Sequence, residues 1–96
     1  MSPTNKKKLE LIRIKLDRLD TELLKLIKKR SNLVNDVLKV KIHKKEIIDQ
    51  KRISFILKKI KKKSIQLNID PKITNRIWKN MIWSFIDYEK RNFKKK

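Results

Sequence analysis

The chain has 96 residues and a formal net charge of +19, with 29 lysines and arginines against 10 aspartates and glutamates. It contains neither cysteine nor glycine, which excludes a disulfide framework, a thiolate metal site and a glycine-rich phosphate loop. Its apolar runs are too short to cross a bilayer, and the polar, basic residues 1–8 are unlike an export signal. We expect one soluble, cytoplasmic domain over residues 1–96, with a disordered basic tail at about 91–96.

A long helix is predicted for the first segment, because its apolar residues recur at alternating spacings of three and four. This heptad seam continues for more than four repeats. Ser2 or Thr4 is a suitable cap for its start, and the periodicity stops near residues 42–45. The seam consists of Leu9, Ile12, Leu16, Leu19, Leu23, Leu26, Arg30, Leu33, Val37 and Val40.

Two shorter helices are predicted further along the chain. One runs from about Ile48 to Leu67, with Asp49 as its N-cap. The other begins at Asp70-Pro71, an acidic cap followed by proline at the first helical position. Their apolar stripes are Ile53, Ile56, Leu57, Ile60 and Leu67 in the first case, and Ile73, Ile77, Trp78, Met81, Ile82, Phe85 and Ile86 in the second.

The length of the first helix favours an all-α homodimer. About 38 helical residues extend roughly 57 Å, whereas a compact chain of this size has a radius of gyration of about 12–13 Å. Two shorter helices cannot cover so long an apolar seam. We therefore expect an entwined dimer of three-helix protomers, in which the two long helices run side by side.

Charged residues occur where the core is expected. Arg30 occupies a seam position, and Lys41 follows on the same helical face about 16 Å along the axis. Arg13 adjoins the seam, Arg52 lies one turn before an apolar position, and Glu89 continues the apolar row of the last segment. One carboxylate cannot neutralise so many cations, and unpaired buried charges are costly. The pattern predicts a cavity for an anion with more than one carboxylate or phosphate, which suits arginine's planar fork. Snorkelling side chains, or one buried arginine that specifies register, are the structural alternative.

The sequence resembles the all-helical class of chorismate mutase. The resemblance extends from about Leu11 to Glu89. It rests on the order and spacing of these segments: Arg13 with Leu19-Asp20, Leu23 through Arg30, Val37 to Lys41, Asp49 through Arg52, and Ile77-Trp78 to Glu89.

The resemblance implies the Claisen rearrangement of chorismate to prephenate, on the route to phenylalanine and tyrosine, without a metal or any other cofactor. Arg30 would bind one carboxylate of this dicarboxylate, and Arg13, donated across the interface by the partner chain, would bind the other. Lys41 would bridge a carboxylate and the ether oxygen. Glu89 would reach the same oxygen from the other side, and we expect it to be protonated there because an ionised carboxylate would repel the developing oxyanion.

Four further positions complete the implied site. Arg52 would help to orient the ring, with Asp49 near the substrate hydroxyl. Ile53 stands where many relatives have a glutamate that binds this hydroxyl, so hydroxyl recognition differs in this chain. Phe85 stands where some relatives place a small polar residue.

Three alternatives remain open from the sequence. The net charge suits a basic helical nucleic-acid-binding protein, although the cations are dispersed and no specific reading module is present. A related lyase, which removes pyruvate from isochorismate, has the same fold. A noncatalytic dimerisation module would leave the charged interior unexplained. His43, the single histidine, lies in a lysine-rich loop and indicates no metal site.

Overall fold

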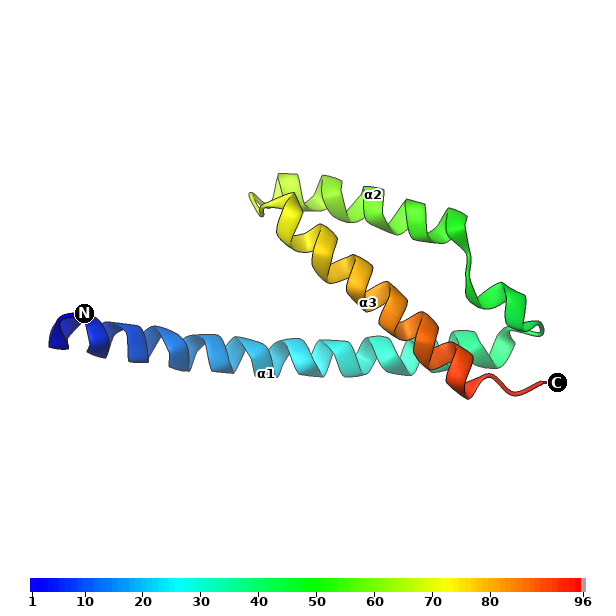
Figure 1. Ribbon diagram of the computed structural model, residues 1–96, viewed down its shortest axis with the longest axis horizontal. Coiled ribbons are helices and arrows are strands. Elements are labelled where there is room, and N and C mark those ends of the chain that lie inside the picture. The colour runs from blue at the N-terminus through cyan, green and yellow to red at the C-terminus, as the bar shows by residue number, and fades with distance from the viewer. Residues whose placement is uncertain (96) are drawn as a thin grey trace. The chain divides into compact units, whose positions relative to one another are not determined.

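The computed structural model describes residues 1–95, and these residues form helices without any strand (Figure 1). Helix α1 (Pro3–Val40) is followed by the short 3₁₀-helix η1 (Lys44–Ile47), by α2 (Gln50–Gln66) and by α3 (Pro71–Asn92). The predicted all-α class is confirmed, and so are the three main helices. No helix within the described residues is long and apolar enough to cross a membrane.

Each main helix begins at a side-chain cap that the sequence suggested. Ser2 Oγ accepts a hydrogen bond from the backbone N–H of Asn5 at 3.1 Å. Asp49 accepts from the N–H of Arg52 at 3.0 Å, and Asp70 accepts from the N–H of Lys72 at 2.9 Å. These bonds satisfy N–H groups that have no partner within the helix.

The chain divides into two compact units, residues 1–33 and the residues from Val34 onward. The first unit is a single helix with an uncovered apolar seam. Six of its seam residues are between 52% and 64% exposed in the single chain: Ile12, Leu16, Leu19, Leu23, Leu26 and Leu33, the last at the unit's end.

The second unit contains a small apolar core. Ile47 of η1 packs with Ile82 and Ile86 of α3, and all three are buried. Partly buried residues around this cluster are Ile48, Ile53, Ile56, Leu57 and Phe93. The core therefore joins η1, α2 and α3.

The expected disordered tail is wrong for its first residues. Helix α3 continues through Asn92, and Phe93 packs against the apolar core. Burial of the Phe93 ring therefore holds this part of the chain in place. Lys96, the last residue of the expected tail, lies outside the described residues.

The apolar stripes of α2 and α3 are narrower than predicted. Ile73, Ile77 and Leu67 are exposed in the single chain. The α2–α3 contact is instead polar beside the turn that joins the two helices, because Ser64 and Thr74 are buried there with their hydroxyl oxygens 2.7 Å apart. Ser64 Oγ also donates to the carbonyl oxygen of Ile60 at 2.6 Å.

The turn between α2 and α3 depends on one residue with a left-handed backbone. Asn68 has φ of 56°, a conformation that glycine adopts most easily and that asparagine tolerates better than most other residues. The N–H of Ile69 then donates to the carbonyl oxygen of Ser64 at 2.8 Å, which closes the end of α2. The chain thus reverses direction between two helices without a glycine.

Candidate active site

An ion pair between α3 and the end of α1 is the central polar feature of the second unit. Lys41 Nζ donates to Glu89 Oε1 at 3.0 Å, and the two side chains are only 17% and 8% exposed. Three other ion pairs among the described residues are largely exposed: Lys25–Glu22, Lys39–Asp36 and Arg91–Asp87. Lys41–Glu89 is therefore the pair that the fold shields from water.

The end of α1 positions Lys41. Lys41 directly follows Val40, the last residue of the helix, and the backbone N–H of Lys41 donates to the carbonyl oxygen of Val37 at 3.2 Å. The following turn is fixed by Glu46, whose carboxylate accepts the backbone N–H of His43 at 2.8 Å. This hydrogen bond lowers the pKa of Glu46 below its usual value, because it favours the charged carboxylate. Local capping thus directs the chain away from α1 immediately after Lys41.

A hollow of about 570 Å³ lies beside this turn. Its volume is in the range of small-molecule sites. Lys41 and Asp49, two residues of the predicted site, both line it. The other lining residues are Glu46, Ile48, Gln50 and Lys51.

The predicted inward orientation of Arg52 is wrong for the single chain. Arg52 is exposed, and its guanidinium carbon lies 5.4 Å from the centroid of the Phe55 ring. Lys59 Nζ lies 5.7 Å from the same centroid. The inward face of α2 is instead occupied by apolar residues that include Ile53, and a cation–π contact stabilises Arg52 outside it.

The remaining predicted site residues have different environments. Ile53 packs against the apolar core rather than presenting a polar group. Phe85 is half-buried on α3. On α1, Arg30 is half-buried and Arg13 is exposed. The second unit thus brings Lys41 together with Glu89 and places Asp49 at the hollow that Lys41 lines.

Sequence reasoning missed a second polar link between α3 and the end of α1. Tyr88 Oη donates to Asn35 Oδ1 at 2.7 Å, and both residues are half-buried. The position of Tyr88, directly before Glu89, was an available signal. Asn35 gave no such signal in the sequence, because one asparagine in a basic helix is usually a solvated residue.

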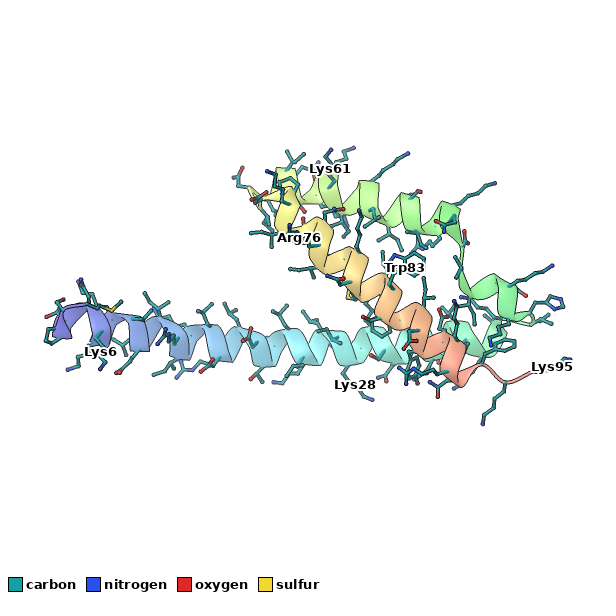
Figure 2. All side chains as sticks on the ribbon, in the orientation of Figure 1. Lys6, Lys28, Lys61, Arg76, Trp83 and Lys95 are labelled. Carbon is teal, nitrogen blue, oxygen red and sulfur yellow. The ribbon has the colours of Figure 1, made fainter. Side chains whose placement is uncertain are left out.

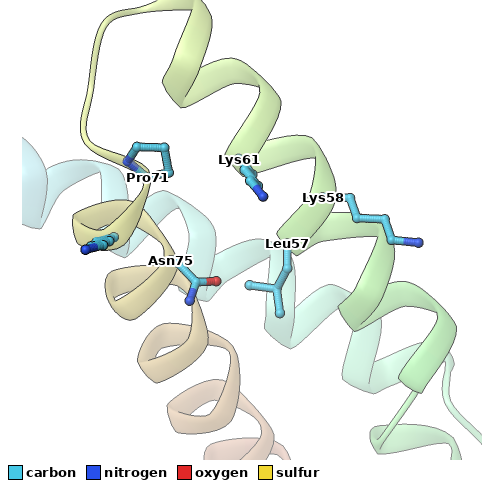
Figure 3. Close-up of a pocket in the computed structure, with 6 residues that line it drawn as sticks. Leu57, Lys58, Lys61, Pro71 and Asn75 are labelled. Carbon is cyan, nitrogen blue, oxygen red and sulfur yellow. The ribbon is translucent and has the colours of Figure 1, made fainter.

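A separate hollow of about 370 Å³ lies between α2 and the start of α3 (Figure 3). It is lined by Leu57, Lys58, Lys61, Pro71, Lys72 and Asn75, none of which belongs to the predicted site. Basic side chains also project elsewhere, including Lys6 and Lys28 of α1 and Arg76 of α3 (Figure 2). Most cations therefore belong to the surface.

Together these features define an all-helical protein with a partly buried lysine–carboxylate pair. The family model for chorismate mutase type II matches residues 12–90, and the chain belongs to this family. The activity of this family is an isomerisation, the conversion of chorismate to prephenate, and the match supports that activity. Neither curated proteins nor solved structures give a significant match.

Proposed function

We propose that the chain catalyses the rearrangement of chorismate to prephenate at a site centred on Lys41 and Glu89. The observation that supports this site is their shielded ion pair, with Nζ and Oε1 3.0 Å apart. Because water is largely excluded, charges on these groups act more strongly on a bound ligand than they would at the surface. The product would supply phenylalanine and tyrosine synthesis.

The reaction is intramolecular and balances without any other reactant. The ether C–O bond breaks while a C–C bond forms between the enolpyruvyl arm and the ring. Negative charge develops on the ether oxygen, where the ammonium of Lys41 stabilises it. Glu89 donates a second hydrogen bond to this oxygen in its protonated form. The substrate would replace Glu89 as the anionic partner of Lys41.

The other charged residues would hold the substrate in its reactive conformer. Arg30 binds one carboxylate, and Arg13 of the second copy binds the other through a bidentate contact. Holding both ends of the molecule restricts its flexible arm, which lowers the entropic part of the barrier.

Recognition of the ring falls to residues of α2 and α3. Asp49 lies at the hollow that Lys41 lines, and it would approach the hydroxyl. Arg52 would leave the Phe55 ring to orient the substrate. Ile53 and Phe85 would supply apolar contacts only, so hydroxyl recognition would depend on Asp49.

The proposed site requires a homodimer. The exposed seam of α1 has six large apolar residues that no part of the first unit covers. Fully burying such a side chain stabilises a protein by about 1.5–3 kcal/mol. Pairing of two seams would provide this burial, and it would bring Arg13 from one protomer to the site of the other.

A direct assay tests the proposal. The purified chain is incubated with chorismate, the loss of chorismate absorbance is followed, and the product is identified by chromatography. Prephenate without a metal or other cofactor is the expected product. Unchanged chorismate would contradict the proposal. Release of pyruvate from isochorismate, without prephenate from chorismate, would identify a lyase instead.

A further inference from the structure

We infer that Tyr88 and Asn35 are positioning residues, whose hydrogen bond sets the alignment of Glu89 with Lys41. This inference rests on the proposed function, because it assigns the pair to the same active site. Tyr88 Oη donates to Asn35 Oδ1 at 2.7 Å, across 53 residues of sequence. It is the second polar link between α3 and the end of α1 among the described residues, beside Lys41–Glu89.

The two links are made by successive residues of α3. Tyr88 and Glu89 differ by about 100° around the helix axis, so their side chains reach α1 at two different points. Asn35 lies in the helical part of α1, whereas Lys41 lies just beyond its end. Two attachment points fix both the rotation of α3 and its position along α1, which one contact cannot do.

The two links differ in stiffness. Lysine has a flexible four-carbon stem and an ammonium that bonds in many directions, so the ion pair tolerates sliding of α3. Tyrosine has a rigid ring with two side-chain torsions, and its bond to Asn35 at 2.7 Å has the usual length of an O–H···O hydrogen bond, which is directional. The hydrogen bond between the uncharged Tyr88 and Asn35 side chains therefore determines where the Glu89 carboxyl lies.

Substrate binding makes this difference important. When Lys41 turns to the substrate, its bond to Glu89 weakens, and the Tyr88–Asn35 link is left to hold α3 against α1. Both residues line a hollow of about 430 Å³ whose other lining residues are Leu38, Lys39, Asn92 and Lys94. Neither Lys41 nor Glu89 lines this hollow, so Tyr88 acts through its neighbour rather than by contact with substrate.

The test compares Tyr88→Phe, which keeps the ring, with Asn35→Ala and Asn35→Asp. Loss of one hydrogen bond should lower kcat roughly fivefold in Tyr88→Phe and Asn35→Ala, with KM within about twofold, because the residues that anchor the carboxylates are unchanged. The double variant Tyr88→Phe/Asn35→Ala should be no slower than either single variant. Asn35→Asp keeps the acceptor and should restore most of the rate.

A matched control is Asn92→Ala. Asn92 lines the same hollow, and its side chain donates to the carbonyl oxygen of Tyr88 at 2.8 Å within α3. Its kcat should equal that of the parent. Parental kcat in Tyr88→Phe, additive losses in the double variant, or failure of Asn35→Asp to restore the rate would each overturn the inference.

A measurement that does not depend on catalytic turnover separates this inference from the proposed function. The ¹³C shift of the Glu89 carboxyl carbon should move in Tyr88→Phe and stay unchanged in Asn92→Ala, with equal helix content by circular dichroism. A parent protein that leaves chorismate unchanged but shows this shift pattern would overturn the proposed function and support the alignment role. An unmoved shift in Tyr88→Phe would overturn the alignment role, whatever the activity.

Discussion

Lys41 and Glu89 neutralise each other across 48 residues of sequence, with Nζ and Oε1 3.0 Å apart. Each is the partner that makes burial of the other tolerable, since an unpaired charge at a shielded position is costly. No buried side-chain nitrogen or oxygen among the described residues lacks a hydrogen-bond partner. Substitution of either residue therefore affects both stability and turnover, and the two effects must be separated.

We expect Lys41→Ala to lower the free energy of unfolding by about 3 kcal/mol, because it leaves the Glu89 carboxylate buried without its partner. Turnover should fall by about 10²–10³-fold. The double variant Lys41→Ala/Glu89→Gln removes the unpaired charge, so it should regain stability in urea titrations but not activity. Glu89→Gln alone keeps a hydrogen-bond donor towards the ether oxygen and should retain turnover. A double variant with parental kcat would exclude Lys41 from catalysis.

The exposed seam of α1 predicts a dimer of about twice 11.7 kDa in sedimentation at micromolar concentration. Leu23→Lys places a charge in the seam and should dissociate this dimer. Thr21→Lys is the matched control, since it adds the same charge to α1 outside the seam. A folded, active monomer of the parent chain would contradict the shared-site architecture.

Donation of Arg13 across the interface predicts complementation between two inactive proteins. Arg13→Ala and Arg30→Ala should each lose most activity, because each lacks one carboxylate contact in both sites. In a mixed dimer, one site regains both arginines. Subunit exchange, verified by native mass spectrometry of differently tagged chains, should therefore restore activity. Absence of recovery in verified heterodimers would place Arg13 and Arg30 in the same protomer's site or outside it.

The buried hydroxyl pair predicts a non-additive effect on stability. Ser64→Ala leaves the Thr74 hydroxyl with one weak contact, to the carbonyl oxygen of Pro71 at 3.4 Å, and should cost about 1–2 kcal/mol in unfolding free energy. Ser64→Ala/Thr74→Val removes both polar groups and should cost less than the sum of the single substitutions. Ser84→Ala is the control, because Ser84 makes a similar bond to Asn80 but is exposed. Additive losses would show that the two hydroxyls act independently.

Glu46 predicts a local dependence of stability on pH. Its pKa is lowered in the folded chain by the hydrogen bond from the backbone N–H of His43. The unfolded chain therefore takes up this proton first as pH falls, so the stabilisation is present above the unfolded value and is lost below about pH 5. Glu46→Gln should reduce the acid sensitivity seen in unfolding titrations. Glu10→Gln, at an exposed position of α1, controls for net charge and should leave that sensitivity unchanged.

Sequence reasoning succeeded where local chemistry determines the structure. Asp70-Pro71 specifies the start of α3 through a carboxylate acceptor and a fixed φ, both of which act within a few residues. The burial of Glu89 was also predictable, because it continues the row of Trp78 and Ile82 on one helical face.

It failed where the periodicity of apolar residues does not determine which side chains are buried. Arg52 was expected to face inwards, but it is exposed, with its guanidinium carbon 5.4 Å from the centroid of the Phe55 ring on the same helix. Thr74 is buried because Ser64 provides a hydroxyl partner from another helix. The burial of Ile47 follows from a 3₁₀ turn too short to have a readable period.

The left-handed turn at Asn68 has a consequence for the unfolded chain. A chain that can reverse direction with asparagine needs no glycine there, and this one has none anywhere. Glycine raises the backbone entropy that a protein loses on folding, so its absence leaves a stiffer denatured ensemble with fewer conformations to give up. This smaller entropic loss helps to explain how a unit with three buried isoleucines can remain folded.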